Sequence, residues 1–274
     1  MKNMKKTHLI AIGFIALAVA CATNPITGKK TLNFVSNSQL FPSAFQQYST
    51  FLRENKVVTG TADARRVEDI GIKIKNAAQK YVQSIGHPEY LNGYQWEYKL
   101  VDDKAINAWC MPGGKIVVYT GILPVTLNDA GLATVMGHEV AHALANHGAQ
   151  RMSAAQLQQI GAVGVAVATG NQSQERQQMW QQYFGMGSQL GIMLPFSRNH
   201  ETEADKIGVM LMAIAGYNPD ESTKFWGRMS QKSNGQAPPE FMSTHPSDAT
   251  RMANLQTFIP EAKAIASKLG TVYK

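Results

Sequence analysis

Apolar residues recur along most of this chain at the spacing of amphipathic helices. Between Ala62 and Ser84 they follow one another at steps of three and four, which places them on one face of a helix. The stretch from Gln39 to Glu54 also looks helical. Further helices are expected from Asn128 to about Gly148, with Asn128 or Asp129 as the cap, from Ser197 to Gly216, and from a cap at Ser247 or Asp248 to about Ile259.

Two shorter stretches carry the patterns of β-strands. Residues 95–101 alternate between apolar and polar positions, and residues 115–120 are rich in β-branched side chains. The segment 107–114 between them ends in a proline and two glycines and is typical of a strand followed by a turn. We therefore expect an α+β chain that is mostly helical and has a small sheet.

Residues 150–192 are helical in pattern but unusual in composition. The segment from Ile160 to Gly170 consists mainly of alanine, glycine and valine, and glutamine-rich sequence follows it. Its apolar part is about half as long as a membrane span. We interpret it as a buried helix or a lid.

The first twenty residues predict a secretory signal peptide. Three lysines precede the apolar run from Leu9 to Ala20, and small residues lead to Cys21. The end of this segment resembles a bacterial lipobox, in which Cys21 is lipidated and anchors the protein to a membrane. An ordinary cleaved signal with a chance cysteine is the alternative. The expected organisation is a signal peptide over 1–20, a tether over 21–37 and one domain over 38–274.

Charge and cysteine content narrow the range of functions. The formal net charge of +7 includes the three lysines of the signal segment, and the other basic residues are scattered. Nothing here favours a nucleic-acid partner. If Cys21 is lipidated, Cys110 has no partner for an internal disulfide. We expect Cys110 to be buried, with a reactive or intermolecular role as the alternative.

The strongest chemical signal lies in the helix that begins near Asn128. His138 and His142 are separated by one helical turn, so both imidazoles project from one face and can bind one ion. Glu139 is rotated away from His138 and can take a proton from a water molecule beside the metal. This arrangement is typical of metalloproteases. An accidental histidine pair is the alternative, but the helical pattern, the caps and the small residues between the histidines favour a metal site.

A catalytic zinc ion needs a third protein ligand. Glu201 and Asp205 are again one turn apart, so one can bind the metal while the other orients a ligating histidine. Taken alone, this pair would be interpreted as a solvated acidic face. His147 and His200 point in other directions around their helices, and His87 lies in a loop, so none of the three is expected to bind the metal.

Four groups of residues resemble one known family, the HtpX- and BepA-type zinc endopeptidases. This is family forty-eight of the metallopeptidases, which also includes the CAAX prenyl protease and OMA1-like enzymes. The resemblance covers nearly the whole mature chain, and the start at Asn24–Gly28 is similar to its secreted lipoprotein members. It is carried by His138 to His147, by Ser197-Arg198 and Glu201 to Asp205, by Thr244 to Ser247 with Arg251, and by Asn107-Ala108 with Pro112 to Gly114.

The resemblance implies a zincin (gluzincin-like) fold and one zinc ion per chain. His138, His142 and Glu201 would be the ligands, Glu139 the general base and Asp205 a second catalytic carboxylate. His245 would lie near the metal, as a plug or as an oxyanion donor, although a histidine in a turn before a helix is an equally good interpretation. Asn107 and Ala108 would lie in an edge strand that binds extended substrate.

The resemblance also implies a setting for the protein. The substrates would be misfolded or unassembled polypeptides of the bacterial cell envelope, the anchor would face the periplasm from the outer membrane, and the envelope assembly machinery would be a partner. Two other functions compete with proteolysis. One is a chaperone-like binding module whose metal site is latent or blocked, by His245 or by residues 150–192. The other is a structural zinc site, which would require four closed protein ligands.

Overall fold

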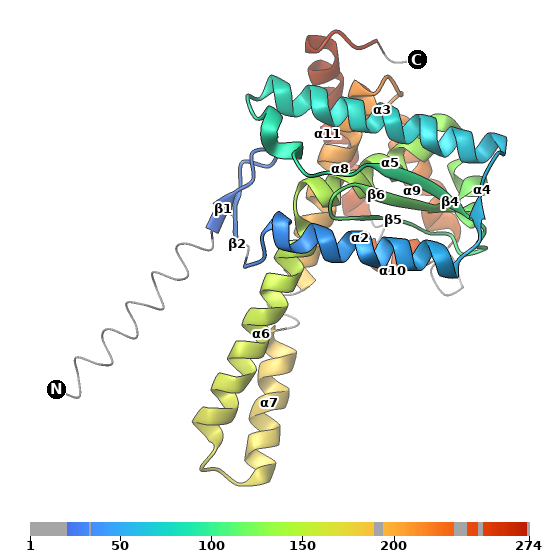
Figure 1. Ribbon diagram of the computed structural model, residues 1–274. Coiled ribbons are helices and arrows are strands. Elements are labelled where there is room, and N and C mark those ends of the chain that lie inside the picture. Colours follow the sequence, from blue (N-terminus) through green and yellow to red (C-terminus); the bar gives the residue numbers. More distant parts are fainter. Residues whose placement is uncertain (1–20, 33, 189–193, 233–239, 246–248, 273–274) are drawn as a thin grey trace. The chain divides into compact units, whose positions relative to one another are not determined.

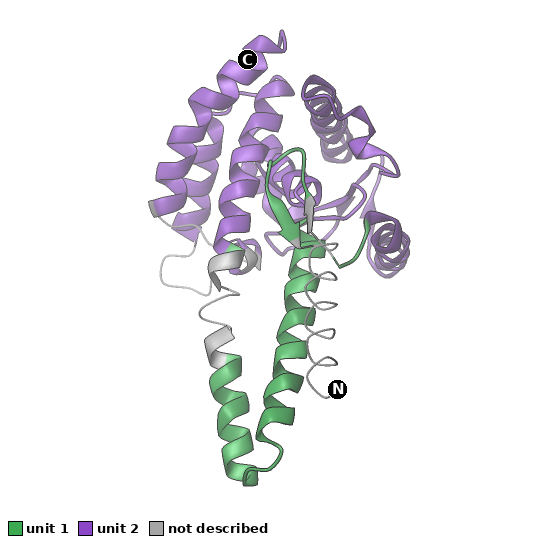
Figure 2. Ribbon diagram, turned by 90° about the vertical axis from the view of Figure 1, so that its left-hand side faces the viewer, with its two compact units in different colours: residues 1–36, 146–197 green, residues 37–145, 198–274 purple. Residues whose placement is uncertain are grey.

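The computed structural model describes residues 21–32, 34–188, 194–232, 240–245 and 249–272 (Figure 1). The expected signal peptide over 1–20 and the caps at Ser247 and Asp248 lie outside the described residues. The chain forms two compact units, one of residues 37–145 and 198–274 and the other of residues 1–36 and 146–197 (Figure 2). The boundaries expected at 21, 38 and 274 stay predictions.

The larger unit contains a four-stranded mixed sheet in the order β3-β4-β6-β5. β4 and β6 are parallel, whereas β3 with β4 and β5 with β6 are antiparallel. β5 therefore forms an edge of the sheet. Within this sheet, the two predicted strands and the strand-and-turn segment are present, whereas the two-residue strand β3 was not expected from the sequence. The strands are β3 (Val57–Val58), β4 (Glu97–Val101), β5 (Ala108–Met111) and β6 (Lys115–Tyr119).

Helices make up most of the rest of this unit, which confirms the expected helix-rich α+β architecture with a small sheet. Two short 3₁₀ turns, Pro88–Leu91 and Thr120–Ile122, flank the strands. The helices are α2 (Asn37–Glu54), α3 (Ala62–Ser84), α4 (Leu123–Thr126), α5 (Asp129–Leu144), α8 (Leu194–Ile214, of which residues from 198 onward belong here), α9 (Glu221–Lys232), α10 (Glu240–Thr244) and α11 (Ala249–Lys268).

The two faces of the sheet are covered by different helices because side chains alternate along each strand. On one face, Tyr48 of α2 forms a core with Val101 and Val117. On the other face, α3 packs against β4, and α5 packs against β5 and β6. A Cβ atom on Gly71 would lie 2.2 Å from the ring of Tyr98, so this contact between α3 and β4 requires glycine.

Helix α5 is the central element of the larger unit, since every residue from Gly131 to Leu144 is buried. The Asn128 side chain accepts a hydrogen bond from the Gly131 amide, as its cap assignment predicts. The helix ends at Leu144, four residues before the predicted stop. The chain leaves it at Asn146, which takes a left-handed conformation that asparagine tolerates better than most residues.

The last helix is longer than its sequence pattern predicts. It was expected to end near Ile259, before Pro260, but α11 continues to Lys268 with Pro260 inside it. A proline in a helix removes one backbone hydrogen bond and costs about 3 kcal/mol. Ala262 and Ala266 beyond it are fully buried, and we attribute the continuation of the helix to this packing.

The smaller unit begins with a β-hairpin in the region where the sequence suggests a tether. Strands β1 (Cys21–Thr23) and β2 (Lys30–Leu32) are antiparallel. The Asn24 side chain closes the turn between them, since it accepts hydrogen bonds from the amides of Ile26 and Thr27. β2 packs against α6.

Helices α6 (His147–Thr169) and α7 (Gln174–Ser188) form a helical hairpin in the smaller unit (Figure 2). The interpretation of the apolar segment as a buried helix is wrong, because Ile160, Val163 and Val167 are 65%, 63% and 78% exposed. A pair of helices buries only their facing stripes, and here Gly161 faces the ring of Phe184. No helix among the described residues is long and apolar enough to cross a bilayer. A role as a lid stays a prediction.

Candidate metal centre

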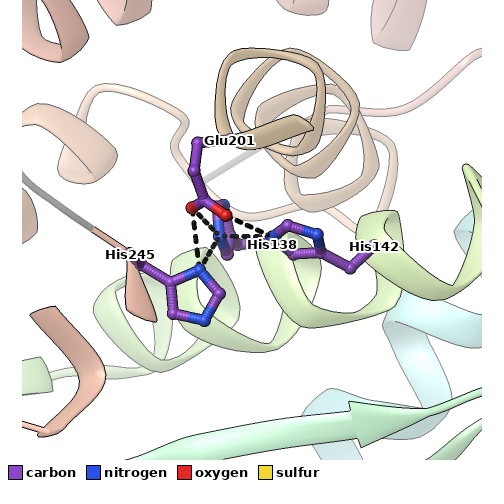
Figure 3. Close-up of side chains that lie close together, drawn as sticks. All are labelled: His138, His142, Glu201 and His245. Carbon is purple, nitrogen blue, oxygen red and sulfur yellow. Dashed lines mark hydrogen bonds and ion pairs between the residues drawn. The ribbon is translucent and has the colours of Figure 1, made fainter. Parts of the chain in front are cut away.

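His138 and His142 project together from the last turns of α5 (Figure 3). One helical turn separates them, and Nε2 of His138 lies 3.1 Å from Nε2 of His142. Both side chains are buried, with 1% and 5% exposure. Two ring nitrogens therefore face a common point inside the larger unit.

Helix α8 brings a carboxylate to the same point. Glu201 places Oε2 3.3 Å from Nε2 of His138 and Oε1 3.3 Å from Nε2 of His142. Glu201 lies 59 positions after His142 in the chain, so the sequence can indicate this meeting only through the chemistry of the residues. The structure brings all three predicted ligands together.

Two glycines allow α5 and α8 to approach closely enough for this contact. A Cβ atom on Gly137 would lie 2.8 Å from the carbonyl oxygen of Gly208, and one on Gly208 would lie 2.8 Å from the backbone nitrogen of His138. Real Cβ atoms do not come so close, so any side chain here would separate the helices and move Glu201 away from the histidines. Sequence reasoning missed this pair because each glycine sits alone in an ordinary helical pattern.

Asp205 lies on the other side of His138, one turn after Glu201. Its Oδ1 accepts a hydrogen bond of 2.9 Å from Nδ1 of His138. A proton on Nδ1 leaves the lone pair of Nε2 free to face Glu201 and His142. The contact fits the division of roles expected for the two carboxylates, in which one binds the ion and the other orients a histidine.

His245 supplies a fourth donor atom to the cluster. It directly follows α10, and its Nδ1 lies 2.7 Å from Oε2 of Glu201 and 3.1 Å from Nε2 of His138. Its ring is also close to Glu139, with Nε2 3.4 Å from Oε1. The sequence left open whether His245 lies near the metal site or is simply a histidine in a turn before a helix. The structure has it near the metal site.

The donor set fits a zinc ion. Four ligand atoms at about 2.0–2.2 Å from a tetrahedral zinc ion lie roughly 3.3 Å from one another. The five distances given above between these donor atoms run from 2.7 to 3.3 Å, one ligand atom from each of the four residues lies within 4.8 Å of the others, and all four residues are buried. Lone pairs that converge in this way require protons or a cation between them, and imidazole with carboxylate is a donor set that zinc accepts.

The electrostatics of the cluster depend on its burial. Burial lowers the pKa of His142 well below its ordinary value. For His138, burial acts in the same direction, but hydrogen bonds with Asp205 and Glu201 outweigh it and raise the pKa to about 9. Burial would raise the pKa of Glu201, yet its contacts with the three histidines hold it far below the usual range. Glu201 is therefore ionised at any physiological pH and can serve as an anionic ligand.

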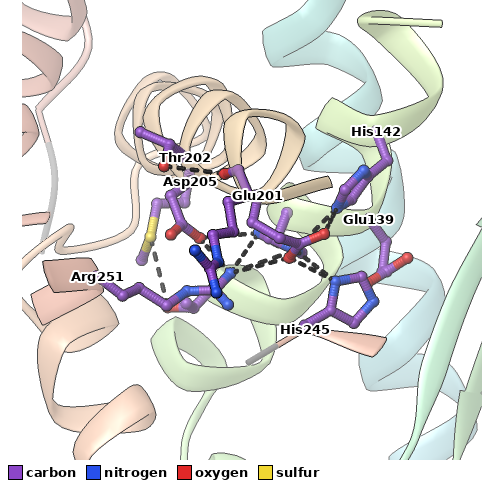
Figure 4. A network of polar contacts seen from close by, with 11 residues as sticks. Glu139, His142, Glu201, Thr202, Asp205, His245 and Arg251 are labelled. Atoms are coloured by element: carbon purple, nitrogen blue, oxygen red, sulfur yellow. Dashed lines mark hydrogen bonds and ion pairs between the residues drawn. The ribbon is translucent and has the colours of Figure 1, made fainter. Parts of the chain in front are cut away.

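Glu139 lies beside the metal cluster without belonging to it (Figure 4). Its side chain is 4% exposed. Burial and then the charge of Glu139 raise the pKa of the Cys110 thiol on β5 well above its usual value. Glu139 belongs to α5, which packs against the edge strand β5, and it also lies close to His245. Cys110 itself is partly rather than fully buried, and its thiol is free.

Two further residues contribute to the site although their spacing in the sequence does not reveal them. Arg251, in the first turn of α11, donates a 2.6 Å hydrogen bond from Nη2 to Oδ1 of Asp205. Its guanidinium lies 3.5 Å above the ring centroid of Trp226 on α9, and that ring also contacts His138. Neither residue stands at a spacing that links it to the metal ligands, so only the family motif that contains Arg251 could have indicated it.

The remaining predicted site residues lie apart from the metal cluster. Asn107 accepts a hydrogen bond from the Ala108 amide at the start of β5, the edge strand that packs against α5. The cluster found among the described residues consists of His138, His142, Glu201 and His245, and His147 and His200 are not part of it. His87 is exposed and lies 3.2 Å from Glu89.

The zincin class of metal proteins is defined by two histidines one turn apart on a helix. A carboxylate from a second helix and an acidic residue beside the histidines complete the arrangement. Comparison with known proteins agrees with this class. The chain belongs to peptidase family M48, whose model matches residues 72–259 and so includes every residue of the cluster. The predicted family and its zincin-like fold are confirmed. Zinc is the cofactor, as expected, because the family uses zinc and the buried cluster can hold it.

The most similar relatives include mitochondrial and bacterial proteins. The chain is 35% identical to mitochondrial metalloendopeptidase OMA1 of Saccharomyces cerevisiae over 221 residues, which are 76% of this chain and 61% of that protein. It is 28% identical to human OMA1 over 88% of this chain and 46% of that protein. The β-barrel assembly-enhancing protease of Escherichia coli is 28% identical over 58% of this chain and 33% of that protein. The chain thus spans from a third to three fifths of these relatives.

Proposed function

We propose that this chain is a zinc-dependent endopeptidase that hydrolyses peptide bonds in polypeptides. The observation that carries this proposal is the position of Glu139, a buried carboxylate next to the cluster of His138, His142 and Glu201. A structural metal site has no use for such a neighbouring acid. A peptidase needs one, because a water molecule must lose a proton as it attacks the scissile carbonyl.

The residues of the chain take distinct parts in this reaction. When bound, zinc supplies a Lewis acid that polarises the scissile carbonyl and makes water acidic near neutral pH. Glu139 accepts the proton of the attacking water and passes it to the amine that leaves. Asp205 holds the His138 ring in the orientation in which Nε2 faces the ligand position.

The edge strand β5 is the proposed binding place for the substrate backbone. β5 pairs with β6 on one side, lies at the edge of the sheet and packs against α5. An extended polypeptide can add to such an edge through main-chain hydrogen bonds, which accept many sequences. Asn107 and Ala108, where this strand begins, are proposed to contact the substrate.

We further propose a location in the bacterial cell envelope, with a lipid on Cys21 that anchors the chain to the outer membrane on its periplasmic side. The apolar segment before Cys21 supports this proposal. Misfolded or unassembled envelope proteins are the proposed substrates, and the name of the E. coli relative supports a link to the assembly machinery for β-barrel proteins. Replacement of Cys21 by serine should move the protein from the membrane fraction to the soluble periplasmic fraction.

His245 supports a second candidate, a latent site that becomes active only after a rearrangement. A catalytic zinc site keeps one position open for water and substrate, whereas here the Nδ1 atom of His245 fills the fourth place in the cluster. A chaperone-like module would keep this closed arrangement. A latent peptidase would release His245 when substrate binds.

Replacement of Glu139 by glutamine separates these candidates. Glu139→Gln keeps the size of the side chain and lies outside the ligand set, so zinc content and fold should be unchanged while casein cleavage falls at least about a hundredfold. Glu68→Gln, which changes an exposed carboxylate on α3, is the matched control and should cleave casein at the wild-type rate. Cleavage by Glu139→Gln at the wild-type rate would refute the assignment. If the wild-type protein and Glu139→Gln rescued a deletion strain equally well, the chaperone-like binding module would be favoured.

A further inference from the structure

We propose that Arg251 is a positioning residue that holds Asp205 on His138 and keeps the Asp205 carboxylate out of the ligand set of the metal. The proposal rests on the zinc site described above and concerns a residue that does not bind the ion itself. Arg251 comes from α11, near the C-terminal end of the chain, whereas Asp205 and His138 belong to α8 and α5.

The guanidinium of Arg251 lies next to both Asp205 and the ligand cluster, since its Nη2 is 3.5 Å from Nε2 of His138 and 3.5 Å from Oε2 of Glu201. Its Nη2 donates to Oδ1 of Asp205 at 2.6 Å and lies 3.3 Å from Nδ1 of His138. The same oxygen of Asp205 accepts the hydrogen bond from His138. Arg251 and His138 thus hold one carboxylate oxygen between them. Figure 4 shows the side chains of Arg251 and Asp205 next to each other.

Packing fixes the guanidinium in this place. Arg251 is 5% exposed, and its guanidinium carbon lies 3.5 Å from the centroid of the Trp226 ring, which is itself fully buried. A flat, delocalised cation can stack on an aromatic ring and donate in its own plane at the same time, which a lysine ammonium cannot do. The orientation of the group is therefore set on one side by Trp226 and on the other by Asp205.

The charges of the site explain why a cation is needed here. Three carboxylates, those of Glu139, Glu201 and Asp205, are buried around the histidines. Zinc neutralises two of these charges, and Arg251 supplies the third positive charge. Buried ions are stable when they are paired in this way. Removal of one partner leaves a carboxylate that must find another cation, and the nearest one would be the metal.

The Asp205 carboxylate is close enough to the ligands to bind the metal if Arg251 is removed. It lies one helical turn from Glu201 on the same face of α8 and already contacts a ligating histidine. Zinc accepts carboxylate oxygen as readily as imidazole nitrogen and can expand to five ligands. Without Arg251, Asp205 would leave His138 and compete for the ion, so the metal would gain a ligand and lose the position that substrate requires.

This role predicts an effect that a purely structural arginine would not have. Arg251→Met removes the charge and keeps an unbranched side chain against Trp226. Because a positive charge near the ion disappears and a carboxylate is released toward it, the zinc dissociation constant should stay equal or become smaller. Turnover should nevertheless fall by about tenfold or more, the size of effect seen when partners of metal ligands are removed.

The experiment uses full-length protein loaded with zinc or with Co²⁺, whose visible absorption reports the number and type of ligands. We expect a weaker and shifted Co²⁺ spectrum for Arg251→Met, and a return toward the wild-type shape in Arg251→Met/Asp205→Asn, which lacks the competing carboxylate. Arg251→Lys keeps the charge without the stacking and should give an intermediate spectrum. It also serves as the test if Arg251→Met does not fold.

Arg228→Met is the matched control. Arg228 donates to the carbonyl oxygens of Val125 and Thr126 and pairs with Glu221, so its loss should lower the melting temperature without altering the Co²⁺ spectrum. A wild-type spectrum and turnover in Arg251→Met would overturn the proposal, as would a zinc dissociation constant increased tenfold with an unaltered spectrum. A wild-type protein that cleaves nothing would refute the proposed activity. The Co²⁺ spectrum and the zinc affinity do not depend on cleavage, so they would still test the role of Arg251.

Discussion

At the scale of single residues, the site contains one donor more than a working peptidase requires. His138, His142 and Glu201 are enough to hold a catalytic zinc ion, because such sites use three protein ligands. Nδ1 of His245 adds a fourth, at 2.7 Å from Glu201 and 3.1 Å from His138. The arrangement found here is therefore a closed one, and we expect substrate to reach a bound ion only when His245 moves.

Replacement of His245 should consequently increase activity. If the closed arrangement dominates, each 1.4 kcal/mol in its favour reduces the active fraction about tenfold. His245→Ala removes that competition, and we expect casein cleavage to rise several-fold, measured as initial rates at saturating zinc. The zinc dissociation constant should rise at the same time, because one donor is lost.

The control for this variant is His87→Ala, which removes an exposed histidine of the larger unit that does not belong to the cluster and should leave both rates and zinc affinity unchanged. A decrease of about a hundredfold in His245→Ala would show instead that His245 stabilises the oxyanion of the transition state, since the loss of one such donor has that size of effect. That result would refute the role of His245 as a plug.

At the scale of elements, the proposed binding of substrate rests on the packing of helix α5 against edge strand β5. Ala108 and Cys110 alternate with Trp109 and Met111 along β5, and the latter two pack toward α2 on the opposite face of the sheet. The first pair therefore faces α5 and Glu139. A polypeptide added to this edge would run past the metal ligands in extended form.

Binding through an edge strand should depend on the backbone of the substrate. Methylation of one amide nitrogen in a peptide substrate removes a main-chain donor, which costs about 0.5–1.5 kcal/mol for each hydrogen bond lost. We expect KM to rise about threefold to tenfold when the methylated amides point toward β5, and to change little when alternate amides are methylated, because successive amides of a strand point to opposite sides. Equal effects at successive positions would argue against strand addition.

The elements also show what local sequence patterns can predict. Helix α3 runs from Ala62 to Ser84 as its apolar periodicity predicts, and Asn128 caps α5, because both features depend on neighbouring residues. We attribute the continuation of α11 past Pro260 to packing against distant residues, which the local pattern that predicted an end near Ile259 does not include. The segment around Ile160 was interpreted as a buried helix or a lid, but it packs against α7 in a pair of helices that leaves one face exposed.

The metal site also contains some features that local sequence patterns predict and others that they do not. His138, Glu139 and His142 share one short motif on one helix, and Glu201 with Asp205 share another, so the order of residues along the chain is enough to infer their chemistry. The contact between Gly137 and Gly208 and the stacking of Arg251 on Trp226 arise where separate helices meet. Spacing within one element carries no information about such meetings.

At the scale of the whole molecule, the donors come from three helical segments that are far apart in the chain. α5 supplies two, α8 supplies one, and His245 follows α10. An ion bound by all of them acts as a cross-link within the larger unit, and its binding energy becomes folding energy of that unit. The smaller unit contributes no donor to the described cluster.

Removal of zinc should therefore lower the melting temperature of the larger unit. At a free zinc concentration about a thousand times the dissociation constant, the ion contributes about 4 kcal/mol. In a unit of this size each kcal/mol corresponds to about 2–4 °C, so the chelated protein should melt about 10 °C lower in calorimetry. Glu201→Ala, which lacks the anionic ligand but keeps three histidines, should show a smaller difference between its melting temperatures with and without zinc than the wild type. A wild-type melting temperature that did not respond to chelation would mean that the four side chains hold together without an ion, which would remove the basis for placing a metal between them.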